Sequence, residues 1–169
     1  PNDAARSIAG PRPLMADATQ SYDLGTLAPL AAELAALDLG WLEEPFPVDD
    51  ADSYRRWRDE PVRPPVAMGE NSYRETGFQR LLEDIAPEIV QPDITKTGGI
   101  SEGRLICRRI LAAGRRACLH MYGGPVGLYA SAHLAAAIEG VSWLEMDSLP
   151  HPLFARLLPD ATQVGLGRA

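Results

Sequence analysis

Short apolar segments recur along the chain, and each runs directly into an acidic residue or a histidine. The polar residues that end successive segments are 23 to 27 positions apart. A strand, a helix and their loops take up about that many residues in a β/α barrel, which builds eight such units from roughly 250 residues. The spacing therefore predicts six strands, at residues 14–17, 40–43, 66–70, 89–93, 117–120 and 141–145.

Helical patterns fill the intervals between these segments. Leu30, Leu34 and Leu37 follow one another at the spacing of one helical face, and Gly40 is a stop signal. Because strands and helices alternate, the fold class is α/β, with parallel strands joined by right-handed crossovers. The expected helices span residues 27–37, 50–57, 76–85, 101–113 and 129–138.

Two of these helices carry specific expectations. The helix at 101–113 is expected to bury Leu105, Ile106 and Ile110, which lie on its apolar face. His133 falls within an alanine-rich helix and is interpreted as an ordinary helical residue without a catalytic role.

Six strands are two fewer than a complete barrel of this kind contains. We expect residues 1–158 to form a partial β/α barrel, with a turn at 150–152 and a last helix at 153–158. Residues 159–169 would form a C-terminal tail, and residues 3–8 have the pattern of a helix end. We therefore expect the chain to be the C-terminal part of a larger protein.

Composition narrows the possible partners. The net charge of −7 argues against nucleic acid, because phosphate binding needs clustered lysine and arginine. No apolar run approaches the roughly 20 residues that span a membrane. Cys107 and Cys118 lie in apolar surroundings, which predicts buried free thiols and a cytoplasmic location. Cys118 lies close to His120, so a reactive thiol is the less favoured alternative.

Three carboxylates end three consecutive strands: Asp17, Glu43 and Glu70. The carboxyl ends of barrel strands face one shared pocket, and neighbouring carboxylates repel one another unless a cation neutralises them. Oxygen ligands without an accompanying cysteine suit Mg²⁺. We therefore predict a magnesium site, and the alternative is a set of separate salt bridges to lysine or arginine.

Asp93 and His120 end the next two strands. An aspartate that is hydrogen-bonded to one imidazole nitrogen fixes the tautomer and raises the basicity of the other nitrogen. Such a pair makes a general base that works near neutral pH. The alternative is a structural histidine that is satisfied by a core partner.

Glu145 ends the sixth strand. If apolar surroundings keep its carboxyl group protonated, it can donate a hydrogen bond to a developing oxyanion. The alternative is a surface acid that follows the last strand.

Three motifs in the chain resemble those of the enolase superfamily, in its mandelate racemase-like subgroup. The resemblance runs from about residue 6 to residue 158, and its motifs are Leu42-Glu43-Glu44-Pro45, Met68-Gly69-Glu70-Asn71 and Pro92-Asp93 with Lys96-Thr97-Gly98-Gly99-Ile100. It implies a modified (β/α)8 barrel preceded by an α+β capping domain, which is absent from this chain. Lys96 belongs to a motif that several subgroups share and is expected to be structural.

The resemblance also implies roles for the strand-end residues. Asp17, Glu43 and Glu70 match the Mg²⁺ ligands. His120 matches the catalytic base, with Asp93 as its partner. Glu145 matches the acid that hydrogen-bonds the substrate carboxylate.

The chemistry shared by such enzymes is removal of the proton α to a carboxylate. We expect an acid-sugar dehydratase that makes a 2-keto-3-deoxy acid, acts on a small carboxylate substrate and forms a homo-oligomer. The runner-up is a racemase or epimerase of a 2-hydroxy acid that uses the same metal site. Two further alternatives are a catalytically silent subunit and an unrelated Mg²⁺ barrel such as a sugar isomerase.

Overall fold

The computed structural model of the chain describes residues 2–146 and 152–157. Within these residues, six parallel strands form one sheet in the order of the sequence, from β1 to β6. The six predicted strands and the α/β class are therefore confirmed, although the third and fourth strands end at residues 68 and 90, before their predicted ends at 70 and 93. The strands are β1 (Leu14–Asp17), β2 (Leu39–Glu43), β3 (Val66–Met68), β4 (Ile89–Val90), β5 (Arg116–Leu119) and β6 (Val141–Leu144).

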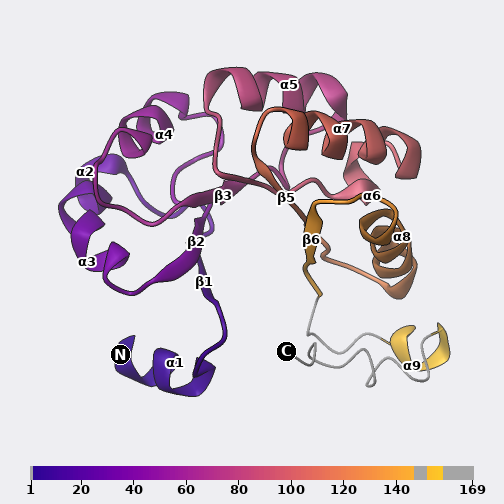
Figure 1. Ribbon diagram of the computed structural model, residues 1–169, viewed down its shortest axis with the longest axis horizontal. Helices are drawn as coiled ribbons and strands as arrows, with labels where there is room; N and C mark the ends of the chain where they lie inside the picture. The colour runs from indigo at the N-terminus through magenta and orange to yellow at the C-terminus, as the bar shows by residue number, and fades with distance from the viewer. Residues whose placement is uncertain (1, 147–151, 158–169) are drawn as a thin grey trace.

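Helices connect successive strands and cover the outer, convex side of the curled sheet, so that the fold is an incomplete barrel (Figure 1). The helices are α1 (Asn2–Ala9), α2 (Leu24–Leu27), η1 (Ala28–Leu30), α3 (Ala31–Ala35), α4 (Ala51–Arg58), α5 (Arg74–Asp84), α6 (Ile94–Thr97), α7 (Ile100–Ala112), α8 (Pro125–Ala136) and α9 (Phe154–Leu157).

Apolar side chains fill both sides of the sheet. The larger cluster, which includes Phe46, Trp57 and Phe78, packs between the strands and the outer helices. A second cluster lines the interior and contains Trp41. The ring of Trp41 on β2 meets the ring of Trp143 on β6 edge to face, with their centroids 6.1 Å apart. The curvature thus brings strands that are not neighbours in the sheet into contact across the interior.

The helix expected at 27–37 is wrong in its bounds and in its buried face. The segment starts earlier and is divided into α2, η1 and α3, because Pro29 enters the first turn of η1 and lacks an N–H. Leu30 is 40% exposed. Leu24, Leu27 and Ala31 are the buried positions. Gly40, which we expected to end the helix, lies inside β2.

The other long helices agree better with the expectations. Helix α7 buries Ile106 and Ile110, but Leu105 is 49% exposed, so the prediction that it is buried is wrong. The burial of Cys107 and Cys118 is confirmed. Burial raises the pKa of the Cys107 thiol to about 11 and raises that of Cys118 as well. Neither thiol is therefore a ready nucleophile.

The end of the chain is described only between residues 152 and 157. Helix α9 confirms most of the helix expected at 153–158. The predicted tail at 159–169 and most of the predicted turn at 150–152 lie outside the described residues. None of the described helices is long and apolar enough to cross a membrane.

Candidate active site

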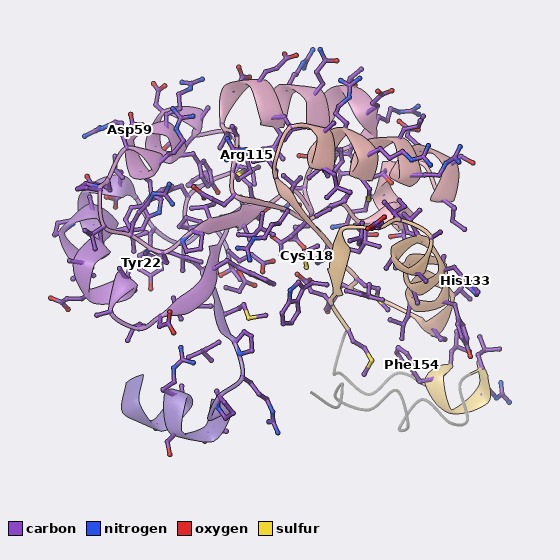
Figure 2. All side chains as sticks on the ribbon, in the orientation of Figure 1. Tyr22, Asp59, Arg115, Cys118, His133 and Phe154 are labelled. Carbon is purple, nitrogen blue, oxygen red and sulfur yellow. The ribbon has the colours of Figure 1, made fainter. Side chains whose placement is uncertain are left out.

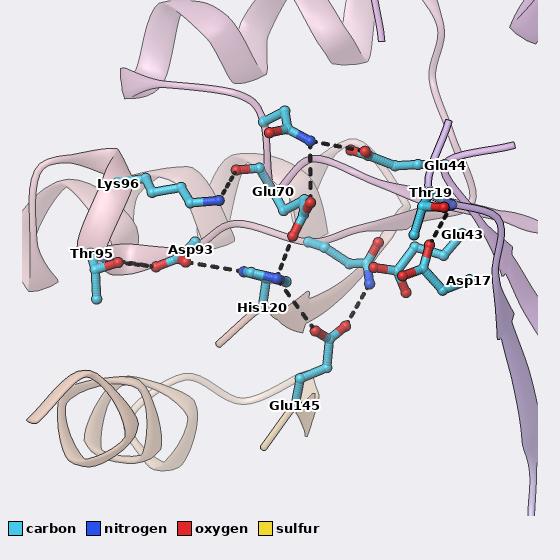
Figure 3. A network of polar contacts seen from close by, with 12 residues as sticks. Asp17, Thr19, Glu43, Glu44, Glu70, Asp93, Thr95, Lys96, His120 and Glu145 are labelled. Carbon is cyan, nitrogen blue, oxygen red and sulfur yellow. Dashed lines mark hydrogen bonds and ion pairs between the residues drawn. The ribbon is translucent and has the colours of Figure 1, made fainter. Parts of the chain in front are cut away.

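Backbone hydrogen bonds continue past the strand ends and bring the predicted site residues to one edge of the sheet. The N–H of Ala18 donates to the Glu43 carbonyl at 2.9 Å, and that of Glu145 donates to the Leu119 carbonyl at 2.9 Å. The N–H of His120 likewise donates to the Pro92 carbonyl at 3.2 Å. As a result, the six side chains lie near one another at the carboxyl ends of the strands, and polar contacts join Glu70, Asp93 and Glu145 to His120 (Figure 3).

Asp93 and His120 form the predicted pair. Asp93 Oδ2 lies 3.0 Å from His120 Nδ1. The other carboxylate oxygen of Asp93 accepts hydrogen bonds from the backbone N–H of Thr95 at 2.8 Å and from its hydroxyl at 2.6 Å. Asp93 thereby caps α6 and is only 1% exposed. The carboxylate is fixed on both sides, so it can hold the imidazole in one orientation.

Opposing effects set the pKa values of this pair. Burial raises the pKa of Asp93, but hydrogen bonds from His120 and Thr95 outweigh it and the pKa is lowered. Burial lowers the pKa of His120, but the hydrogen bond with Asp93 and the charges of Glu70 and Glu145 outweigh it and the pKa is raised. The pair therefore favours an ionised aspartate beside a more basic imidazole.

Glu70 faces the other nitrogen of the imidazole. Its Oε2 forms an ion pair with His120 Nε2 (Figure 3). Its Oε1 accepts a hydrogen bond from the side chain of Asn71 at 3.2 Å. The Nζ of Lys96, the single lysine in the sequence, donates to the Glu70 carbonyl oxygen at 3.2 Å. This contact agrees with the structural role expected for Lys96.

Asp17 and Glu43 are directly opposite each other on β1 and β2. Asp17 Oδ1 accepts the N–H of Thr19 at 2.8 Å, and Glu43 Oε2 accepts the indole N–H of Trp41 at 3.1 Å. Burial raises the pKa of Glu43, and the negative charges of Asp17 and Glu70 raise it further. The negative charges of the other two carboxylates therefore act on Glu43.

The donor set fits a hard cation by its chemistry. All three side chains offer oxygen ligands, and their mutual repulsion is the kind that a divalent ion relieves. Across residues 2–146 and 152–157, however, no three acidic, histidine or cysteine side chains converge as a ready metal site. The three carboxylates thus have suitable chemistry for a cation but do not converge on one point. Glu70 accounts for part of this, because its carboxylate pairs with His120.

Glu145 approaches the same imidazole from β6. Its Oε2 lies 3.9 Å from His120 Nε2, and its Oε1 accepts the side-chain N–H of Gln91 at 2.6 Å. Burial and the charge of Glu43 raise the pKa of Glu145 to about 7, although His120 and Gln91 oppose the shift. A carboxyl group with this pKa is partly protonated at neutral pH and can donate a hydrogen bond.

Sequence reasoning missed two polar residues of this network. Gln91 is 0% exposed and Glu44 is 3% exposed. Glu44 Oε2 accepts hydrogen bonds from Gln20 at 2.8 Å and from Asn71 at 2.9 Å. The signal available in the sequence was a second polar residue close to a strand-end acid: Glu44 directly after Glu43, and Gln91 two residues before Asp93. His133 lies exposed on α8, away from the network, as expected (Figure 2).

Known proteins resemble the chain in sequence and in fold. Residues 2–169 match the family model described as enolase C-terminal domain-like. A D-xylonate dehydratase of Haloferax volcanii is 36% identical over 132 residues, which cover 78% of this chain and 32% of that protein. Other curated relatives are named as dehydratases of arabinonate, of L-talarate and galactarate, and of L-rhamnonate, and another as a D-galactarolactone cycloisomerase.

Solved structures from the same group of proteins resemble the chain in fold. A mandelate racemase/muconate lactonizing enzyme of Bordetella bronchiseptica RB50 superposes with a TM-score of 0.84 and 36% identity, over 94% of this chain and 45% of that one. An enolase of Bradyrhizobium complexed with magnesium and mandelic acid superposes with a TM-score of 0.77 and 28% identity, over 86% and 39%. The chain thus spans less than half the length of the proteins that it matches.

Proposed function

Because the chain belongs to the enolase superfamily, through its enolase C-terminal domain-like family, we propose that the protein removes water from a sugar acid. The substrate would be an aldonate or aldarate, and the product a 2-keto-3-deoxy acid. The reaction class is that of a carbon–oxygen lyase. The names of the curated relatives support a sugar acid as substrate.

The observation that carries this proposal is the pairing of Asp93 with His120. The 3.0 Å contact with Asp93 favours a proton on Nδ1. Nε2, which faces Glu70 and Glu145, is then the nitrogen that takes up and releases a proton. His120 then takes the proton α to the substrate carboxylate through Nε2. General-base catalysis of this kind contributes about 10²- to 10⁴-fold to a rate.

Removal of this proton leaves negative charge on the oxygens of the substrate carboxylate. Glu145, in its protonated form, donates a hydrogen bond to one of these oxygens, as in an oxyanion hole. Asp17, Glu43 and Glu70 would hold Mg²⁺, which when bound supplies a Lewis acid that offsets the same charge.

The water leaves from the carbon next to the α-carbon. His120, now an imidazolium, gives the proton that it took to the β-hydroxyl group. The β-carbon–oxygen bond breaks, water departs, and the electrons of the former C–H bond form the carbon–carbon double bond. The resulting enol rearranges to the 2-keto-3-deoxy acid, so that atoms and protons balance without any further reactant.

Racemisation is the second candidate, and it requires a base on the opposite face of the substrate. Lys96 does not supply that base, because its Nζ is engaged with the Glu70 carbonyl oxygen. We rank dehydration first because several curated relatives are named as dehydratases of sugar acids. Oligomerisation and a cytoplasmic location remain predictions from the sequence.

The test is incubation of the full-length protein with Mg²⁺ in D₂O, with a panel of aldonic and aldaric acids, followed by proton NMR. A new 2-keto-3-deoxy product is the expected result and identifies the substrate. Exchange of the α-proton without elimination would replace dehydration by racemisation or epimerisation. If no acid in a complete panel exchanges although Mg²⁺ is bound, the proposed function is wrong.

A further inference from the structure

Gln91 lies between two acids of the site without being one of them. It follows β4 directly, and its backbone N–H donates to the Met68 carbonyl oxygen at 2.9 Å. Its side chain is completely buried. The amide nitrogen donates to Glu145 at 2.6 Å, and the amide group also lowers the pKa of Glu43.

The position of this amide is unusual for a buried side chain. Its oxygen atom, Oε1, has no hydrogen-bond partner within the described residues. A buried polar group without a partner is unfavourable for folding. An apolar residue of the same length would avoid this cost, so stability alone does not account for a glutamine here.

The chemistry of an amide suits the space between two carboxylates. The negative charge of Glu43 raises the pKa of Glu145. An amide N–H donates a hydrogen bond without adding charge. A carboxylate at position 91 would add repulsion, and an ammonium group would form an ion pair with both acids.

We propose that Gln91 is a positioning residue that orients Glu145. By binding Oε1 of Glu145, the amide leaves Oε2 directed toward the side of His120 Nε2, at 3.9 Å. This is the side on which the substrate carboxylate would lie. The catalytic consequence rests on the proposed function, whereas the orientation of Glu145 does not.

The first test is a double-mutant cycle in the full-length protein, on the acid that the NMR panel identifies. Gln91→Met keeps the length of the side chain and removes its hydrogen bonds. We expect kcat to fall about 10- to 100-fold, as is typical for partners of functional groups, with KM nearly unchanged. In a Glu145→Gln background, the same change should lower kcat by less than about 2-fold, because the group that it positions is already altered.

Ile89→Val is the matched control, because Ile89 is buried on β4, two residues before Gln91, and carries no polar group. Its kcat should stay close to the wild-type value. If Gln91→Met lowers kcat equally in both backgrounds, Gln91 acts independently of Glu145 and the proposal is wrong. If Gln91→Met does not fold, Gln91→Asn, which retains an amide on a shorter side chain, takes its place in the cycle with the same expectations.

A crystal structure of the variant tests the proposal without any substrate. We expect the Glu145 carboxyl group to leave its place beside His120 in Gln91→Met and to keep it in Ile89→Val. An unmoved Glu145 in Gln91→Met would overturn the proposal even if the enzyme is an active dehydratase. A wild-type protein that acts on no sugar acid would overturn the proposed function alone.

Discussion

At the scale of single residues, the imidazole of His120 is the point at which the site is organised. Asp93 holds one nitrogen, and Glu70 and Glu145 approach the other. The sequence could predict this set because each member is a charged or titratable residue at the end of an apolar run. Gln91 could not be found in this way, since a neutral amide within an apolar run gives no electrostatic signal.

Replacing His120 by asparagine should abolish elimination. The variant keeps a polar side chain of moderate size but has no group that accepts the α-proton. We expect kcat to fall by about 10²- to 10⁴-fold, which is the range associated with a general base. Proton NMR of the product measures this fall. Asp93→Asn is the companion variant, and full activity in either would remove the assigned base.

The pH dependence of stability follows from the pKa of Glu145. Its pKa is raised from 4.5 to about 7 in the folded protein, so the folded state binds more protons than the unfolded state between these values. Stability of the metal-free protein should therefore fall as pH rises through this window, by up to about 3 kcal/mol. The raised pKa of His120 acts in the same direction above its unfolded value.

The change of the free energy of unfolding with pH is measured by urea unfolding in the presence of a chelator, from about pH 4.5 to pH 8. Glu145→Gln should reduce this pH dependence, because the amide does not titrate, and the remainder comes from groups such as His120 and Glu43, whose pKa values are also raised. The lowered pKa of Asp93 has the opposite sign, but it acts at pH values near and below the unfolded pKa of aspartate, about 3.9. A wild-type protein that becomes more stable across this range would contradict the assignment.

At the scale of elements, the order and approximate positions of the strands were predictable, because apolar runs mark them in the sequence. Strands β3 and β4 nevertheless end at Met68 and Val90, two and three residues before their predicted ends. Helices α4 and α7 lie within one residue of their expected bounds. The segment around Pro29 was misjudged because leucine spacing suggested one continuous helix, whereas the proline divides it. Leu105 was misassigned because helix α7 buries a narrower face than its apolar residues suggest.

The loop between β3 and α5 depends on Gly69, which has a φ of +136°. A Cβ atom at this position would lie 3.0 Å from the backbone nitrogen of Gln91 and 3.3 Å from a methyl group of Val90. Gly69→Ala should therefore lower the free energy of unfolding by more than about 1 kcal/mol and displace Glu70. Thermal unfolding measures the loss of stability, and the affinity of the protein for Mg²⁺ measures the displacement of Glu70.

Gly99→Ala is the control for this change. Gly99 also has a positive φ, of +93°, but a Cβ atom there would meet nothing within 4 Å. Gly99→Ala should lower the free energy of unfolding only by the cost of a positive φ for alanine, and its affinity for Mg²⁺ should not change. Equal losses in the two variants would show that the close approach to Gln91 is unimportant.

At the scale of the whole molecule, the site gathers negative charge in a chain whose net charge is already −7. We expect Mg²⁺ to raise the melting temperature of the protein, because it offsets the repulsion among Asp17, Glu43 and Glu70. The increase should be larger near about pH 8 than near pH 5, since protons compete with the cation for carboxylates. Differential scanning calorimetry with and without a chelator provides the measurement.

Glu43→Gln separates this effect from general screening by salt. The variant removes one carboxylate from the set and should lose most of the gain that Mg²⁺ gives. Asp59→Asn, on the exposed end of α4 (Figure 2), should retain the gain in full. If the two variants respond alike, the cation acts on the whole surface and has no site among the strand ends.

The order of the strands has a consequence for how the molecule folds. Each strand pairs with its neighbours in the sequence, so the sheet can grow one unit at a time from local contacts. The hydrogen bond between Gln91 and Glu145, in contrast, joins residues 54 positions apart. We expect Glu145 to reach His120 only when the sixth strand is in place. During refolding, enzymatic activity should therefore return later than helical structure does.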